Sequence, residues 1–262
     1  MEASVLGWTA LAVVVLMCST WALSLAMKDA GIVDIVWGLG FVVVAWVARL
    51  TAHGVSERQN LLVVCTTVWG LRLAGYLFWR NHGKVEDFRY RAMRKHYGPR
   101  FPLMSLLTVF GLQGVLMWTV SLPVQLGQMP DRPMSLGPLA YVGAALWLVG
   151  LLFETIGDLQ LARFKARPDN TGRVMDTGLW AWTRHPNYFG DFCVWWGLFL
   201  IAGETRLGLW AVIGPIVMSV LLLRVSGVTM LEKTITKRRP GYAEYVARTS
   251  AFFPRPPRSS IS

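Results

Sequence analysis

Long apolar stretches are the feature that most restricts how this chain can fold. A helix needs about 20 mostly apolar residues to cross the hydrocarbon core of a bilayer, and the 262-residue sequence contains seven candidates. These are Val5–Met27, Ala30–Ala52, Gln59–Trp79, Ser105–Gly127, Leu136–Asp158, Tyr188–Ala202 and Leu207–Leu231. Only 16% of the residues are charged, too few to cover a water-soluble fold. The sequence therefore predicts an all-α, polytopic membrane protein with seven transmembrane helices.

The sixth stretch, Tyr188–Ala202, is the shortest of the seven. It crosses the bilayer only if it tilts or extends backward through Gly178–Trp182, so six spans with one re-entrant segment is the alternative. The first stretch has the position of a signal peptide. Glu2 stands where a signal peptide carries basic residues, and the apolar run is longer than usual. We expect it to be retained as a span.

Positive charges are distributed unevenly between the two ends of these spans. Of the 26 Lys and Arg residues, 20 fall on one side, in Lys28, the loops Arg80–Arg100 and Arg163–Arg184, and the tail from Lys233. Cytoplasmic loops carry such an excess, so we expect the N-terminus outside and the C-terminus in the cytoplasm. This placement predicts an inner or plasma membrane protein surrounded by lipid. It does not indicate a nucleic-acid partner, despite the net charge of +11.

The sequence shows no linker or internal repeat. We expect a single transmembrane domain over residues 1–255 and a disordered tail over residues 256–262, because the chain becomes proline-rich near its end. The two long loops lie on the predicted cytoplasmic side. A water-soluble cofactor would therefore bind from the cytoplasm.

Several polar residues lie inside the apolar stretches, where an ionisable group is costly unless it is paired or faces a wet cavity. They are Asp34, Arg72, Gln113, Glu154, Asp158, Asp191 and Arg224. Glu154 and Asp158 are four residues apart, so both carboxylates share one helix face. These residues form either buried ion pairs, such as Asp34 with Arg72, or the lining of a polar cavity open to the cytoplasm.

The strongest local pattern runs from Gly178 to Asp191. Arg184, His185 and Asn187 offer hydrogen-bond donors around Pro186, and a helix that begins there has free N–H groups. The pattern indicates an anion site for a phosphate-bearing cofactor or, alternatively, for lipid headgroups. Nucleotide-loop, hydrolase and metal-ligand motifs are absent from the sequence, so we expect no metal site.

The same pattern, from Gly178-Leu179-Trp180 through Arg184-His185-Pro186-Asn187-Tyr188-Phe189-Gly190-Asp191, resembles the C-terminal signature of the steroid 5-alpha-reductase family. Three other stretches are also similar: Asp158 with the basic run to Lys165, Arg72 with Tyr76, and the ending Tyr242–Tyr245 with Phe253-Pro254. The resemblance covers roughly residues 30–255 and is strongest over 154–195. It is greatest to the bacterial and plant branch, whose members mostly lack an assigned substrate.

The resemblance implies a seven-helix fold that binds NADPH and reduces a carbon–carbon double bond conjugated to a ketone in a hydrophobic substrate. Hydride goes to the beta carbon, and an acid near the carbonyl oxygen stabilises the enolate. By motif position, the implied cofactor-binding residues are Arg72, Tyr76, Asp158, Lys165, Asn187 and Asp191. We expect Arg184, His185 and Tyr188 of the same signature to bind the cofactor with them.

The sequence departs from the steroid enzymes where the substrate binds. Those enzymes hold the substrate ketone with a Glu on the second helix and a Tyr on the third, where this chain has Asp34 and Trp69. We expect both to face the substrate, with Asp34 as the proton donor, because Trp has one N–H and no acidic proton. Asp191 also replaces the family's Glu. A reductase remains possible, but a steroid substrate does not follow.

Two alternatives remain open. Isoprenylcysteine carboxyl and phospholipid methyltransferases carry a similar Arg-His-Pro-x-Tyr-x-Gly signature, followed by a Glu and Tyr-x-x-Tyr, which this chain matches at Arg184–Gly190, Glu232 and Tyr242–Tyr245. Such an enzyme would use S-adenosylmethionine. The second alternative is a non-catalytic, lipid-binding membrane protein on the same fold.

Overall fold

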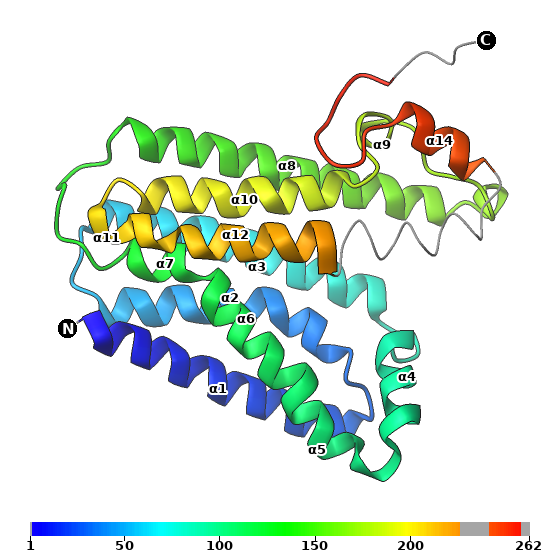
Figure 1. Cartoon of the computed structure of the whole chain (residues 1–262), viewed down its shortest axis with the longest axis horizontal. Coiled ribbons are helices and arrows are strands. Elements are labelled where there is room, and N and C mark those ends of the chain that lie inside the picture. Colours follow the sequence, from blue (N-terminus) through cyan, green and yellow to red (C-terminus); the bar gives the residue numbers. More distant parts are fainter. Residues whose placement is uncertain (1, 226–240, 258–262) are drawn as a thin grey trace. The chain divides into compact units, whose positions relative to one another are not determined.

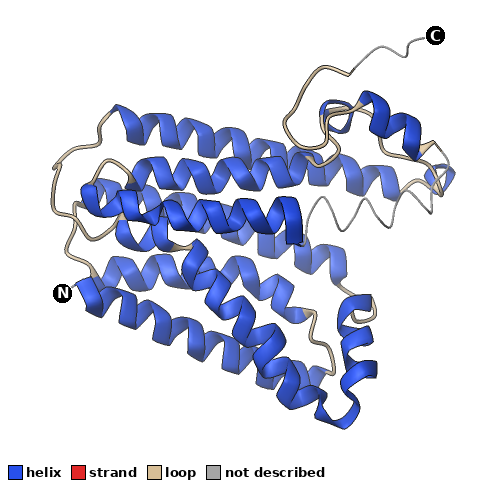
Figure 2. Cartoon of the chain, in the orientation of Figure 1, coloured by secondary structure: helices blue, strands red, loops and turns tan. Residues whose placement is uncertain are grey.

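The computed structural model describes residues 2–225 and 241–257, and these residues form helices and loops without a strand (Figure 2). They group into two compact units. Unit 1 comprises Met1–Tyr141 with Leu198–Gly214, and unit 2 comprises Val142–Gly197 with Pro215–Ser262. The single transmembrane domain over residues 1–255 stays a prediction.

Unit 1 begins with three long helices that lie side by side (Figure 1). Its helices are α1 (Glu2–Met27), α2 (Ile32–Thr51), α3 (Ser56–Asn81), α4 (Phe88–Tyr97), η1 (Gly98–Arg100), α5 (Phe101–Ser105), η2 (Leu106–Gly111), α6 (Leu112–Val120), α7 (Leu122–Leu126), α11 (Arg206–Leu209) and η4 (Trp210–Val212). Its interior includes the fully buried side chains of Phe41, Leu62 and Trp69. Leu50 and Val115 are 79% and 65% exposed, as expected for helices that face lipid.

Unit 2 is built on α8 (Pro138–Lys165) and α10 (Pro186–Ala202), most of whose residues belong to it. Its other helices are η3 (Pro168–Asn170), α9 (Leu179–Trp182), α12 (Ile213–Val220), η5 (Leu221–Val225) and α14 (Tyr242–Arg248). The helices α9 and α14 lie close together in Figure 1. The end of the predicted span Leu207–Leu231, together with Glu232, lies outside the described residues, as do residues 258–262 of the predicted tail.

Six helices of the described chain are long and apolar enough to cross a membrane. They are Ser4–Met27, Ile32–Thr51, Ser56–Asn81, Phe88–Val120, Pro138–Lys165 and Arg206–Val225. These helices identify an integral membrane protein, and each overlaps a stretch predicted from the sequence. The remaining stretch forms α10, which has 17 residues and a length of about 25 Å, below the hydrocarbon thickness of about 30 Å.

The backward extension of α10 through Gly178–Trp182 does not occur. Gly178 has a positive φ of 62°, Trp182 ends the short helix α9, and Thr183 is extended with φ −148° and ψ 145°. Pro186 then begins α10, a position where its missing N–H costs no helical hydrogen bond. The polar turn Thr183–His185 therefore separates the two helices.

A close glycine contact joins α2 and α3. A Cβ on Gly70 would lie 2.5 Å from the Gly38 carbonyl oxygen, whereas a Cβ on Gly75, on the same helix, has no atom within 4 Å. We expect Gly70→Ala to lower the melting temperature of the purified protein by about 5 °C, because overpacking against a backbone costs about 1–3 kcal/mol. The matched variant Gly75→Ala should leave it unchanged or slightly higher. Equal melting temperatures for the two variants would contradict the tight helix contact.

Candidate functional site

The predicted proton donor Asp34 lines a pocket in unit 1. This pocket has a volume of about 340 Å³ and lies among the start of α2, the end of α3 and the loop 82–87. Ile32, Ile35 and Phe78 supply apolar walls, while Asp29 and Lys84 add charged groups. The pocket can therefore hold a mostly apolar molecule with one polar end.

Two side chains from α4 bind the carboxyl group of Asp34. Arg89 Nη2 donates to Asp34 Oδ2 at 2.9 Å, and Tyr90 Oη donates to Asp34 Oδ1 at 2.7 Å. Tyr90 is only 5% exposed, and its hydroxyl accepts a hydrogen bond from Gln113 Nε2 at 3.4 Å. Asp34 is thus an ion-paired carboxylate next to a buried phenol. The sequence offered an ion pair between Asp34 and Arg72, but in the structure the carboxyl group of Asp34 binds Arg89 and Tyr90 of α4.

Two acidic residues before α4 hold this helix in place. Asp87 caps it by accepting from Arg89 N at 2.9 Å. Glu86 accepts from Ala30 N at 2.8 Å and from Arg94 Nη2 at 2.8 Å. Burial raises the pKa of the Glu86 carboxyl, but the hydrogen bonds from Arg94 and Ala30 outweigh it and leave this pKa below its ordinary value.

The lowered pKa of Glu86 predicts a pH-dependent contribution to stability. A depressed carboxyl pKa stabilises the fold above the unfolded-state value of 4.5, and this contribution is lost as pH falls through the folded-state value. We expect Glu86→Gln to lower the melting temperature at pH 7, with a difference from wild type that narrows as pH is lowered below about 4.5. Glu57→Gln, at an exposed glutamate of α3, is the matched control. A difference for Glu86→Gln that stays constant with pH would contradict this role.

Three further predicted residues lie on α3 of unit 1. Trp69 is fully buried and packs edge-on against Phe41, with ring centroids 5.5 Å apart. Among the described residues, those that line the Asp34 pocket do not include Trp69. The guanidinium carbon of Arg72 lies 5.5 Å from the centroid of the Tyr76 ring, one helical turn away. Arg72 and Tyr76 therefore form a cation–π pair.

In unit 2, the C-terminal segment binds the signature turn. Arg184 N donates to Ser250 O at 2.9 Å, Thr183 Oγ1 donates to Phe252 O at 2.8 Å, and Arg255 N donates to Trp182 O at 3.0 Å. Tyr245 Oη donates to Trp180 O at 2.6 Å. These contacts join residues more than 60 positions apart. We call residues 242–255, which bind the turn, the C-terminal strap.

Arg184 makes the central contacts between the signature turn and the C-terminal strap. Its side chain is 9% exposed, and Nη1 donates to the carbonyl oxygens of Thr249 at 2.7 Å and Val246 at 3.2 Å. Carbonyls at the end of a helix lack intrahelical partners, so Arg184 caps α14. The side chain predicted to bind the cofactor has a structural role in this arrangement.

The other signature residues lie where α10 meets α8. Asn187 Nδ2 donates to Asp158 Oδ1 at 3.3 Å, and Asp158 is 5% exposed. His185 and Tyr188 stack with centroids 5.5 Å apart and planes 5° apart. Asp191 follows Asn187 by four residues on α10, so both share one helix face. The structure thus brings together Asp158 and Asn187, two residues predicted to contact the same cofactor.

A pocket of about 220 Å³ in unit 2 lies at the end of α8. Gln160, Arg163, Arg167 and Asn170 line it, and Gln160 Oε1 accepts from Leu179 N at 3.0 Å. Lys165 is the exposed last residue of α8. This pocket offers two guanidinium groups and amides, a donor set suited to a phosphate.

The predicted site residues therefore divide between the units. Asp34, Trp69, Arg72 and Tyr76 belong to unit 1, whereas Asp158, Lys165, Arg184, His185, Asn187, Tyr188 and Asp191 belong to unit 2. The sequence did not identify Arg89 and Tyr90 as partners of Asp34. The sequence treats this segment as part of the loop Arg80–Arg100, and nothing in it links Arg89 to a residue 55 positions earlier.

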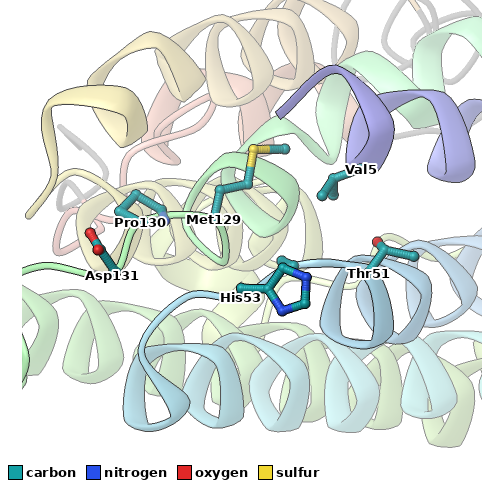
Figure 3. Close-up of a pocket in the computed structure, with 7 residues that line it drawn as sticks. Val5, Thr51, His53, Met129, Pro130 and Asp131 are labelled. Carbon is teal, nitrogen blue, oxygen red and sulfur yellow. The ribbon is translucent and has the colours of Figure 1, made fainter. Parts of the chain in front are cut away.

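A further pocket of about 240 Å³ in unit 1 contains no predicted site residue. Its lining comes from the start of α1, the end of α2 and the loop after α7, with Val5, Met129, His53 and Asp131 shown in Figure 3. Val5 and Met129 also pack together in a small apolar cluster.

These features define an all-helical integral membrane protein with a polar pocket in unit 1 and a hydrogen-bonded polar turn in unit 2. A family model described as "Protein of unknown function (DUF1295)" matches residues 20–249, and the chain belongs to this family. It is 23% identical over 266 residues to uncharacterized protein C594.04c of Schizosaccharomyces pombe, a match that covers 90% of this chain and 75% of the relative. No solved structure matches the chain.

Proposed function

We propose that this protein is an NADPH-dependent membrane reductase that acts on a carbon–carbon double bond of a hydrophobic enone or related lipid. The contact between Asp158 and Asn187 carries the proposal. Asn187 belongs to the signature that resembles steroid 5-alpha-reductases, and Asp158 belongs to a separate stretch that resembles the same family. The two side chains meet at a partly buried position. The proposed topology has seven spans, the N-terminus outside and the cofactor site facing the cytoplasm of an inner or plasma membrane.

The residues of unit 2 fit a dinucleotide phosphate. Arg163 and Arg167 offer charged donors in one pocket, where a phosphate group would bind. Asp158 and Asn187 can accept from and donate to hydroxyl or amide groups, and the stacked His185 and Tyr188 present a flat aromatic surface. Arg184 does not belong to this donor set in our proposal, because its Nη1 group donates to carbonyl oxygens at the end of α14. Bound NADPH would supply the hydride.

In unit 1, the Asp34 pocket would bind the substrate. Its apolar walls suit a hydrophobic skeleton, and Asp34 is the polar group that would face a carbonyl. Since Asp34 is paired with Arg89, it must take up a proton before it can donate one. Tyr90, at 2.7 Å, is the neighbour that orients the carboxyl and shares that proton. Trp69 would support the pocket through packing with Phe41 instead of touching substrate.

Cofactor binding by the purified, detergent-solubilised protein tests the proposal. A ligand that binds the native state raises its melting temperature, so NADPH, NADH and S-adenosylmethionine can be compared without a substrate. We expect NADPH at about 100 times its Kd to stabilise the fold by about 2.7 kcal/mol, and Asn187→Ala to abolish this stabilisation. Asn60→Ala, at an exposed asparagine of α3, should respond to NADPH as wild type does.

The other outcomes separate the alternatives. Stabilisation by S-adenosylmethionine alone would overturn the reductase in favour of a methyltransferase. No shift with any of the three ligands would favour a non-catalytic lipid-binding protein.

A further inference from the structure

The helix α4 has two faces with different partners. Its inner face carries Arg89, Tyr90 and Arg94, which bind Asp34 and Glu86. Its outer face carries Phe88, Arg91 and Lys95, which are all exposed and follow one another at spacings of three and four residues. Side chains at these spacings share one side of a helix. The inner face is therefore paired within the protein and the outer face is available to a partner.

Within the part of the chain that the structure describes, the outer cations form no salt bridge, and Arg91 acts on the Glu86 carboxylate only as a more distant charge. Arg91, Lys95 and, just beyond α4, Arg100 are exposed. None of the three forms an ion pair with another residue in the ranges 2–225 and 241–257. Arg89 and Arg94, on the inner face of the same helix, each have a carboxylate partner at 2.9 or 2.8 Å. The helix itself contains no acidic residue.

The neighbouring exposed residues indicate that α4, at the start of the candidate span Phe88–Val120, lies at the membrane surface and not inside the bilayer. The exposed apolar side chains Leu103 and Leu107, at 66% and 65%, begin directly after Arg100, where a lipid-facing helix begins. Before α4, Trp79 is 64% exposed near the end of α3, and tryptophan is enriched at the bilayer interface. Phe88 is 67% exposed beside Arg91. A short helix with cations and one aromatic residue on its free face, bracketed by two span ends, matches an interfacial helix.

We propose that the outer face of α4 binds anionic phospholipid headgroups of the surrounding membrane through Arg91, Lys95 and Arg100, with Phe88 entering the acyl boundary. Each cation near an anionic membrane surface strengthens binding, and the guanidinium groups can bind phosphate through two hydrogen bonds. Because the inner face of the same helix binds Asp34, a bound lipid also holds in place the Arg89 and Tyr90 side chains that bind this carboxylate. The lipid interaction itself does not depend on the proposed reaction.

Native mass spectrometry of the full-length protein in detergent tests this inference. The protein is titrated with phosphatidylglycerol or phosphatidylcholine, and bound lipids are counted. We expect wild type to prefer phosphatidylglycerol, and the triple variant Arg91→Gln, Lys95→Gln, Arg100→Gln to bind it at least about 10-fold more weakly. The control Arg49→Gln, Arg132→Gln, Arg206→Gln removes equal charge from the predicted opposite side and should keep most of the binding.

Three results would overturn the inference. They are unchanged phosphatidylglycerol binding by the α4 triple variant, an equal loss in the control, or equally effective displacement of the lipid by soluble glycerol phosphate. The variant Arg91→Lys, Lys95→Arg, Arg100→Lys keeps the charges and should keep the binding, which separates lost recognition from misfolding.

Discussion

Asp34→Asn is expected to lower the turnover of the proposed reductase by at least about 100-fold, the range that a positioned general acid contributes. Asparagine cannot take up and deliver a proton, although its amide oxygen can still accept a hydrogen bond from either Arg89 or Tyr90. NADPH stabilisation of the variant should be unchanged, because Asp34 lies in the substrate pocket of our proposal. The measurement is NADPH oxidation by protein reconstituted in lipid with a panel of hydrophobic enones.

The matched control for this prediction is Asp29→Asn. Asp29 lines the same pocket, but its carboxyl accepts a hydrogen bond from Gly31 N and does not bind Arg89 or Tyr90. We expect a small effect on turnover for Asp29→Asn. Full activity of Asp34→Asn, or equal losses for both variants, would show that the Asp34 carboxyl is not the acid. Tyr90→Phe should reduce turnover less than Asp34→Asn, because it leaves the carboxyl in place.

Arg184→Ala is expected to give the largest loss of stability. The side chain is buried and donates to two carbonyl oxygens of the C-terminal strap, and hydrogen bonds from a charged donor are each worth about 1.5–3 kcal/mol. We predict a loss of about 3 kcal/mol in the free energy of unfolding, measured by thermal and denaturant unfolding. Release of the strap should also increase proteolysis after Arg248.

Arg248→Ala is the matched control for Arg184→Ala. Arg248 also belongs to the C-terminal strap, and it pairs with Asp176, but its side chain is 44% exposed. Exposed ion pairs contribute about 0–1 kcal/mol, so the control should be close to wild type. Arg184→Lys should fall between the two because one ammonium group cannot reproduce the guanidinium geometry. If Arg184→Ala were as stable as Arg248→Ala, the capping role would be wrong.

The apolar stretches predicted the helical fold well because lipid permits few alternatives to a helix. The predicted spans Ala30–Ala52 and Gln59–Trp79 correspond to α2 and α3, with ends shifted by a few residues. The sequence predicted that a helix begins near Pro186, but it left open whether the span extends backward through Gly178–Trp182, and the structure breaks the helix at Thr183. That break depends on Thr183 and Arg184 finding backbone partners in the C-terminal strap, which lies far away in the sequence.

The same limit applied to the polar residues. The apolar surroundings marked Asp34 as unusual, but they could not identify Arg89 and Tyr90 as its partners, because no sequence pattern shows which distant segment a side chain will contact. For Arg184, cofactor contact stays a prediction, but nothing in the sequence showed that its Nη1 group donates to carbonyl oxygens at the end of α14. Asp158 and Asn187 were each predicted to contact the cofactor, which stays a prediction, and the hydrogen bond between them was seen only in the structure.

The contacts of the C-terminal strap also bear on the order in which the protein is made. The turn at Thr183–His185 receives partners from Ser250 and Phe252, and Arg255 donates to Trp182. A nascent chain that has inserted its helices therefore still lacks these partners, and the turn is complete only when the ribosome has released residue 255. Until then the Arg184 side chain also lacks the carbonyl oxygens of Val246 and Thr249, to which it donates in the complete fold. Reporter fusions are best joined beyond this point.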